Sequence, residues 1–294
     1  QMPNTHFING LTQKIAKLGT NTAKAAFLVT LFTLAVSLFN WGLGLIFGAI
    51  LARKTGEFAS QNNQKLNYPL IGAAGYSGLM VWHGGLSGSA PLKVAESGHF
   101  LVDKIGQIPL SATVFSPMNL TVSLSLLIVL PLLMYFVGKN GQDKKIKLTT
   151  SLNEVFLNPI QLSGAEKLDY SRIFALLLAI PILITAFYKA IKIGDLSVIN
   201  PNYINFVLLG LGLLLHQNIA SYTSSVTTAI TSSTGILIQF PIYAGIMGVM
   251  KYSGLTDVFT AFFVEISTQN TYSIYTFFSA GLVNIFVPSG GGQW

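Results

Sequence analysis

The chain has 294 residues, of which only 9% are charged and 51% are hydrophobic, and its mean hydropathy is +0.58. Soluble globular domains carry roughly 25% charged residues, so this chain could not cover a water-exposed surface. The composition therefore excludes an ordinary soluble enzyme and intrinsic disorder. It predicts an all-α, polytopic membrane protein.

The net charge of +7 comes from 17 Lys/Arg against 10 Asp/Glu. These charges form no basic stripe with interleaved aromatic residues, so we predict no nucleic-acid partner. In a membrane protein such an excess usually marks cytoplasmic loops. The chain has no cysteine, and its four histidines lack metal-ligand spacing. We therefore predict no disulfide, no metal site and no bound cofactor.

Stretches without Asp, Glu, Lys or Arg locate the candidate membrane segments, because a helical crossing needs about 20 apolar residues. They are 25–52, 66–92, 105–138, 173–188, 196–250 and 266–294. The main polar stretch between them, 139–170, is rich in lysine and is predicted to be a cytoplasmic connector.

Lysine and arginine flank segment 25–52 on both sides, which places both of its ends inside. A single crossing cannot satisfy this pattern, so we predict a re-entrant hairpin. Its tip would be the polar, glycine-rich break Asn40–Gly44. Two arms of about 12 residues would reach about 18 Å each, near the middle of the membrane. Irregular backbone at that depth is tolerated only where it lines a cavity or is buried in protein.

The last segment, 270–294, contains a similar break at 287–292 and would enter from the opposite side. Two re-entrant elements of opposite entry indicate inverted-topology repeats. Residues 1–138 would form most of the first repeat, and 171–294 part of the second. Because the sequence starts at Gln and stops within an apolar segment, we expect an internal fragment that is incomplete at both ends.

Segment 68–92 is predicted to be a broken helix, because Gly84, Gly85 and Gly88 would unwind it. Freed N–H groups and helix N-termini can hold an anion, and freed carbonyl groups can hold Na⁺. The hydroxyl groups of Ser87 and Ser89 would add to such a site. The alternative is that these small residues only allow close helix packing.

His83 is the one ionisable residue deep in a predicted span. It could bind a carboxylate or relay a proton, or it could be a neutral residue hydrogen-bonded to a neighbouring helix. No Asp or Glu lies within a predicted span. A coupling ion would then be H⁺ carried by histidine, or Na⁺ held by neutral oxygens.

Four motifs resemble those of the bacterial short-chain fatty acid transporter family, and the resemblance covers essentially the whole chain. They are Asn40-Trp-Gly-Leu-Gly-Leu, Gly78-Leu-Met-Val-Trp-His-Gly-Gly-Leu-Ser-Gly-Ser-Ala-Pro-Leu, Ser233-Thr-Gly-Ile-Leu-Ile-Gln-Phe-Pro-Ile-Tyr-Ala-Gly and Val287-Pro-Ser-Gly-Gly-Gly-Gln-Trp. The resemblance implies inverted repeats, an elevator-type alternation and a homodimer. It also implies that substrate and cation bind at the hairpin tips.

The resemblance further implies short monocarboxylates, such as butyrate or acetoacetate, as substrates. The candidate substrate and ion-binding residues are Asn40, Trp41, Gly42, Gly44, Trp82, His83, Gly84, Gly85, Ser87, Ser89, Pro288, Ser289, Gly290, Gly291 and Gly292.

The predicted function is therefore a cation-coupled secondary transporter, not an enzyme, in the lipid bilayer of the bacterial inner membrane. The alternative is a dicarboxylate or other organic-anion carrier of the same architecture. The absence of arginine from the proposed site disfavours it, because dicarboxylates often recruit bidentate arginine. A channel would need a continuous pore ring, and an intramembrane enzyme an oriented nucleophile and base.

Overall fold

The computed structural model describes residues 6–145, 148, 163–232 and 234–286. Within these ranges the regular structure is almost wholly helical. Three described helices are long and apolar enough to cross a membrane: α2 (Thr22–Phe39), α7 (Pro117–Lys139) and α9 (Arg172–Ile193). The chain divides into two compact units, residues 1–226 and 227–294.

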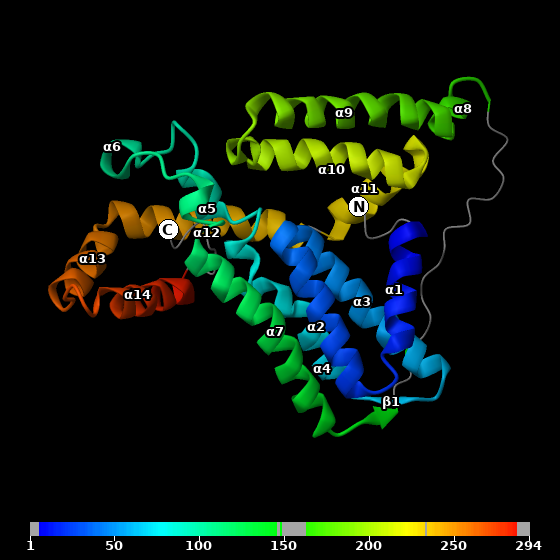
Figure 1. The fold of residues 1–294 in the computed structure, drawn as a ribbon, viewed down its shortest axis with the longest axis horizontal. Helices are drawn as coiled ribbons and strands as arrows, with labels where there is room; N and C mark the ends of the chain where they lie inside the picture. The colour runs from blue at the N-terminus through cyan, green and yellow to red at the C-terminus, as the bar shows by residue number, and fades with distance from the viewer. Residues whose placement is uncertain (1–5, 146–147, 149–162, 233, 287–294) are drawn as a thin grey trace. The chain divides into compact units, whose positions relative to one another are not determined.

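In the first unit, α2 packs against both α3 (Trp41–Gln61) and α7, and α1 (His6–Leu18) packs against α3 (Figure 1). The Oδ1 atom of Asn21 caps α2 by accepting the N–H of Lys24 at 2.9 Å. Helices α2 and α3 contain 18 and 21 residues. They are longer than the expected hairpin arms, because both continue past the charge-free stretch. The re-entrant placement of this pair stays a prediction.

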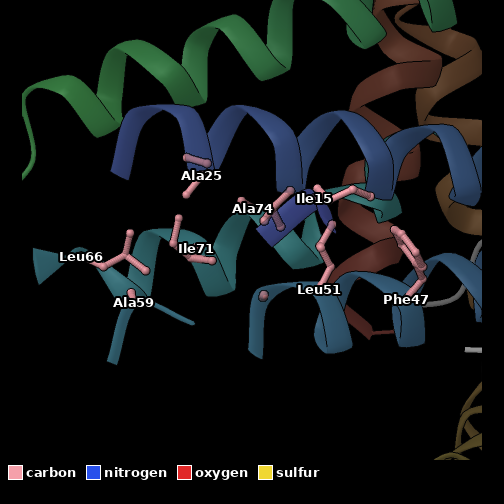
Figure 2. Close-up of a cluster of buried hydrophobic side chains, with 11 residues drawn as sticks. Ile15, Ala25, Phe47, Leu51, Ala59, Leu66, Ile71 and Ala74 are labelled. Atoms are coloured by element: carbon pink, nitrogen blue, oxygen red, sulfur yellow. The ribbon is translucent and has the colours of Figure 1, made fainter. Parts of the chain in front are cut away.

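The main hydrophobic core of the first unit lies where α1, α2 and α3 meet β1 (Lys65–Leu66) and α4 (Tyr68–Tyr76) (Figure 2). Its labelled members are Ile15, Ala25, Phe47, Leu51, Ala59, Leu66, Ile71 and Ala74. Several are alanines, which let the helix backbones come close together.

Glycine brings α3 and α4 into direct backbone contact. A Cβ atom at Gly48 of α3 would overlap the carbonyl oxygen of Gly75 in α4. One turn away, Ser37 of α2 fits between Gly44 and Gly78, where either Cβ would overlap the Ser37 hydroxyl. Small residues at these positions are what tight helix packing within a membrane requires.

The outer faces of α7 and α9 are strongly apolar and exposed. Ile128 of α7 is 62% exposed, and Ile173 of α9 is 72% exposed. Each helix also contains an internal proline, Pro131 and Pro181. Apolar side chains that point away from the protein are typical of helices surrounded by lipid.

The chain from α4 to α7 is broken into short pieces. At its two ends, β1, which precedes α4, pairs antiparallel with β2 (Lys144–Lys145), which follows α7. After α4 come two 3₁₀ turns, η2 (Ser77–Met80) and η3 (Trp82–Gly84), and then α5 (Ser89–Val94). The glycines of this region interrupt the helix between residues 76 and 89, so its backbone is irregular within an apolar segment.

The loop 95–108, which contains the short α6 (Val102–Ile105), is organised around a buried histidine and leads to η4 (Leu110–Ala112). His99 is 1% exposed, and its Nδ1 accepts the N–H of Leu101 at 3.2 Å. Its Nε2 therefore carries the proton and donates to the carbonyl of Gly106 at 2.9 Å. Ile108 closes the loop by donating its N–H to Val94 at 2.9 Å. His99 thus has a structural role.

Helices α9 and α10 (Pro201–His216) lie side by side as a hairpin (Figure 1). Gly210 packs against Ile182 and Leu183, and the hydroxyl of Tyr203 donates to the carbonyl of Ala186 at 3.2 Å. The short α8 (Glu166–Asp169) precedes α9, and η5 (Leu196–Val198) lies in the connection between α9 and α10.

Helix α11 (Ile219–Ser232) crosses the boundary between the units. The second unit contains α12 (Thr234–Tyr252), α13 (Leu255–Glu265) and α14 (Tyr272–Phe286), and consecutive helices contact each other. Gly254 makes the turn before α13 with a φ of +77°, a conformation that favours glycine.

We predict that Gly48→Ala destabilises the protein by about 1–3 kcal/mol, because the added Cβ overlaps rigid backbone at Gly75. Gly72→Ala is the matched control, since a Cβ at Gly72 in α4 meets nothing within 4 Å. Thermal unfolding of the purified proteins in detergent measures the difference. Equal midpoints for the two variants would contradict the close contact of α3 and α4.

Candidate functional site

A single residue, Asn40, ends one helix and starts the next. Its backbone N–H donates to the carbonyl of Val36 at 3.0 Å, which closes α2. Its Oδ1 accepts the N–H of Leu43 at 2.9 Å, which caps α3. The extended backbone of Asn40, with φ of −154° and ψ of 127°, turns the chain between the helices. The side-chain amide oxygen of Asn40 is therefore used in building the start of α3.

The glycine turn of residues 84–88 docks onto this break. Leu86 donates its N–H to the carbonyl of Leu38 at 2.8 Å, and Trp41 donates its N–H to Ser87 Oγ at 2.8 Å. A Cβ at Gly85 would overlap the Leu38 carbonyl, so only glycine fits there. The structure thus brings together two groups of predicted site residues that are more than 40 positions apart in the sequence.

The first turn of α3 leaves one backbone donor open. Ser87 accepts the N–H of Trp41, and Asn40 accepts the N–H of Leu43. The N–H of Gly42 has no acceptor among the residues that the structure describes. The start of a helix also carries the positive end of the helix dipole, so this position favours an anion.

Aromatic rings flank the start of α3. The rings of Trp41 and Trp82 have their centroids 5.8 Å apart and are tilted by 44°. The His83 ring lies 3.7 Å from that of Trp82. All three side chains are half-buried, and no hydrogen bond to the His83 ring is formed within the described ranges. Two indole rings therefore lie at the start of α3, with one titratable ring beside them.

The remaining predicted residues of these two groups differ in their surroundings. Gly44 is buried against Ser37, and a Cβ at Gly84 would overlap the side chain of Asn119. These two glycines therefore have packing roles. Ser89 is exposed at the first position of α5. The role of Ser89 in binding stays a prediction.

Sequence reasoning missed Asn119 of α7. Its Nδ2 donates to the carbonyl of Gly84 at 2.8 Å and to that of Val114 at 2.7 Å. Asn119 thus ties the glycine turn to α7. Asn119 lies near the start of α7, where Ser116 Oγ accepts its N–H at 3.2 Å. This position is typical of ordinary helix capping, so the sequence gives no sign of the contact with Gly84, 35 residues away.

Sequence reasoning also missed three buried hydroxyl groups on α2. The Oγ atoms of Thr30, Thr33 and Ser37 have no hydrogen-bond partner within the described structure, and these residues are 0% exposed. Their spacing places them on one face of α2, the face where Ser37 meets Gly44 and Gly78. A buried hydroxyl without a partner costs about 1–3 kcal/mol, so this face is polar at a cost to stability.

His216 has a different environment from His83. Its Nδ1 lies 2.9 Å from the carbonyl of Gly212 and therefore carries the proton, while Nε2 accepts from the Ser225 hydroxyl at 3.0 Å. His216 thus ties the end of α10 to α11. Among the described residues, no three His, Cys, Asp or Glu side chains are grouped to hold a metal ion.

A family model described as "Short chain fatty acid transporter" matches residues 2–294. The chain belongs to the short-chain fatty acid transporter family. The description is that of transport proteins, not of enzymes. Together with the three apolar helices, membership makes the chain a multi-pass membrane protein, as its composition predicted.

Two curated relatives of this family carry the name "Putative short-chain fatty acid transporter". The protein of Escherichia coli (strain K12) is 33% identical over 292 residues, which cover 98% of this chain and 65% of the relative. The protein of Haemophilus influenzae (strain ATCC 51907 / DSM 11121 / KW20 / Rd) is 34% identical over 295 residues, which cover 95% of this chain and 64% of the relative. The chain thus spans slightly less than two thirds of these family members. No solved structure matches it significantly.

The second predicted tip of the family's site, Pro288, Ser289, Gly290, Gly291 and Gly292, lies outside the described residues, which end at Phe286. The site that the structure describes is therefore the one formed by Asn40–Gly44 and the turn 82–89.

We predict that Asn119→Ala loosens the glycine turn, because two backbone carbonyls lose their donor. The expected loss of stability is about 1–2 kcal/mol. The chain has no cysteine, so Ser89→Cys provides a single label position beside the turn. Asn119→Ala should make a maleimide react several-fold faster there.

Thr121→Ala is the control for this experiment, because the Thr121 hydroxyl donates to the carbonyl of Pro117 in its own helix. If both variants label at the same rate, Asn119 does not hold the turn.

Proposed function

We propose that this chain forms most of a secondary active transporter that moves short-chain fatty acids across the bacterial inner membrane. Family membership over residues 2–294 supports this proposal. In the structure, the observation that carries it is the start of α3, where the N–H of Gly42 is open within an apolar, uncharged part of the chain.

Two neutral donors at this point suit one carboxylate. Gly42 offers its backbone N–H at the positive end of α3. Ser87 accepts the N–H of Trp41, which leaves its own hydroxyl proton free to donate. One carboxylate has two oxygens, so these two donors match a monocarboxylate without requiring a charged residue.

The surroundings of the donors suit a short apolar tail. The half-buried rings of Trp41 and Trp82 lie beside the start of α3. No arginine lies in 25–52 or 66–92, so a second carboxylate would lack a bidentate partner. These features favour butyrate or acetoacetate over a dicarboxylate.

Cation coupling is also part of the proposal. No Asp or Glu lies in 25–52 or 66–92, so the coupling ion is either H⁺, carried by His83, or Na⁺, held by neutral oxygens. His83 packs on Trp82 next to the proposed carboxylate site, which supports a role for this ring.

The proposed architecture has two inverted repeats, joined by a cytoplasmic connector at 139–170. Residues 1–138 form most of the first repeat, and 171–294 form part of the second. Helices α2 and α3 on either side of Asn40 would form the first re-entrant hairpin, and 270–294 part of the second. A homodimer with elevator-type alternation completes the proposal. The abrupt break at Asn40 and the irregular turn 84–88 support broken helices at a binding site.

We predict saturable butyrate uptake into proteoliposomes that contain this chain joined to the flanking segments of the Escherichia coli relative. A Na⁺ gradient and a pH gradient are imposed separately, and the one that drives uptake identifies the coupling ion. Accumulation of succinate without butyrate would instead support the organic-anion alternative. Uptake of neither anion would contradict the proposal.

We also predict that Ser87→Ala raises the KM for butyrate about 5- to 30-fold, because it removes a donor to the carboxylate and the acceptor for Trp41. Ser97→Ala, in the exposed loop 95–108, is the control. An unchanged KM in Ser87→Ala, with butyrate still transported, would place the carboxylate elsewhere.

A further inference from the structure

A groove with an apolar lining lies between the end of α1, the first half of α2 and the second half of α7. Its volume is about 330 Å³. Five of its lining residues are Leu18, Phe27, Leu28, Leu132 and Tyr135, and Lys24 is the one charged residue of the lining. Binding pockets start at about 300 Å³, so this groove is large enough for part of an acyl chain.

Exposed lysines gather at the same end of the first unit. Asn67 donates its N–H to Thr22 Oγ1 at 3.0 Å, which joins the β1 region to the start of α2. Gly138 packs against Ala23, and β2 pairs with β1, so the end of α7 lies there too. The lysines on these elements and on the last turn of α1 are Lys17, Lys24, Lys65, Lys139, Lys144 and Lys145.

These six lysines have no carboxylate partner among the described residues, where ion pairs form only between Arg53 or Lys54 and Glu57, and between Lys93 and Glu96. The carboxylate of Asp143, just before β2, accepts a hydrogen bond from the hydroxyl of Thr22 at 2.6 Å.

The pairing of β1 with β2 adds to this charge. Lys65 lies directly opposite Lys145 in the ladder. Like charges in this position destabilise a strand pair, so an anion bound between them would stabilise it.

We infer that this end of the protein binds an anionic phospholipid, with an acyl chain in the groove and the phosphate among the lysines. Lys24 belongs to both parts and joins them. Helices α2 and α7 are candidate membrane spans, and the lysines lie at their ends, where lipid headgroups would be. The charge selects an anion, and the apolar groove selects a lipid over a soluble phosphate.

The inference is independent of the transport proposal, so its test does not use transport. The chain, joined to the flanking segments of the Escherichia coli relative, is purified in detergent and titrated with phosphatidylglycerol or with phosphatidylcholine of the same acyl chains. Native mass spectrometry measures the bound fraction. We expect clear preference for phosphatidylglycerol, and no binding of sn-glycerol 3-phosphate, which has the phosphate without the acyl chains.

Two kinds of variant separate the roles of charge and groove. Lys24→Gln and Lys65→Gln should each reduce the preference for phosphatidylglycerol by about 5-fold, with phosphatidylcholine binding unchanged. Leu132→Trp, at a half-exposed position of α7, should fill the groove and reduce the binding of both lipids. Lys189→Gln and Lys192→Gln on α9 are charge-matched controls.

Three results would overturn the inference. They are equal binding of the two lipids, a preference that survives both lysine substitutions, and binding of glycerol phosphate as strong as that of the lipid. Monodisperse elution of each variant by size-exclusion chromatography verifies that a loss of binding is not a loss of folding.

Discussion

Two hydrogen bonds between distant segments organise the centre of the first unit. The N–H of Leu86 reaches the carbonyl of Leu38, and the N–H of Trp41 reaches Ser87. They satisfy backbone and side-chain groups at the end of one helix and the start of the next. Asn119 holds the same turn from α7. The open N–H of Gly42 depends on this framework, because the framework fixes where α3 begins.

The helices around this framework approach each other through small residues instead of large apolar ones. Gly48 meets Gly75 backbone to backbone, and Ser37 fits between two glycines. Within a lipid environment, apolar side chains gain little by leaving lipid for protein, so close packing and hydrogen bonds carry the association. This explains why the bulky side chains of α7 and α9, such as Ile128 and Ile173, point outward.

Local signals allowed much of this to be predicted from the sequence. Asn followed by Trp-Gly marked the break between α2 and α3, and the glycines marked the turn after η3. The helix ends were predicted less well, because charge-free stretches ignore caps such as Asn21. The bond from the N–H of Trp41 to Ser87 and the bond from Asn119 to Gly84 could not be predicted, since they join residues 46 and 35 positions apart. Nothing in the local sequence distinguishes such an asparagine from an ordinary polar residue near a helix start.

The single residue between α2 and α3 has a mechanical consequence. The torsions of Asn40 set the angle between these helices, and rotating its ψ separates Asn40 Oδ1 from the N–H of Leu43, which breaks the cap of α3. The turn that docks on the break would also lose its bond from Trp41. Bending at Asn40 therefore costs hydrogen bonds, and we expect α2 and α3 to move as one rigid body. A displacement of the pair as one body would be accommodated at its ends, in residues 19–21 and 62–64, and would leave the geometry at the start of α3 unchanged.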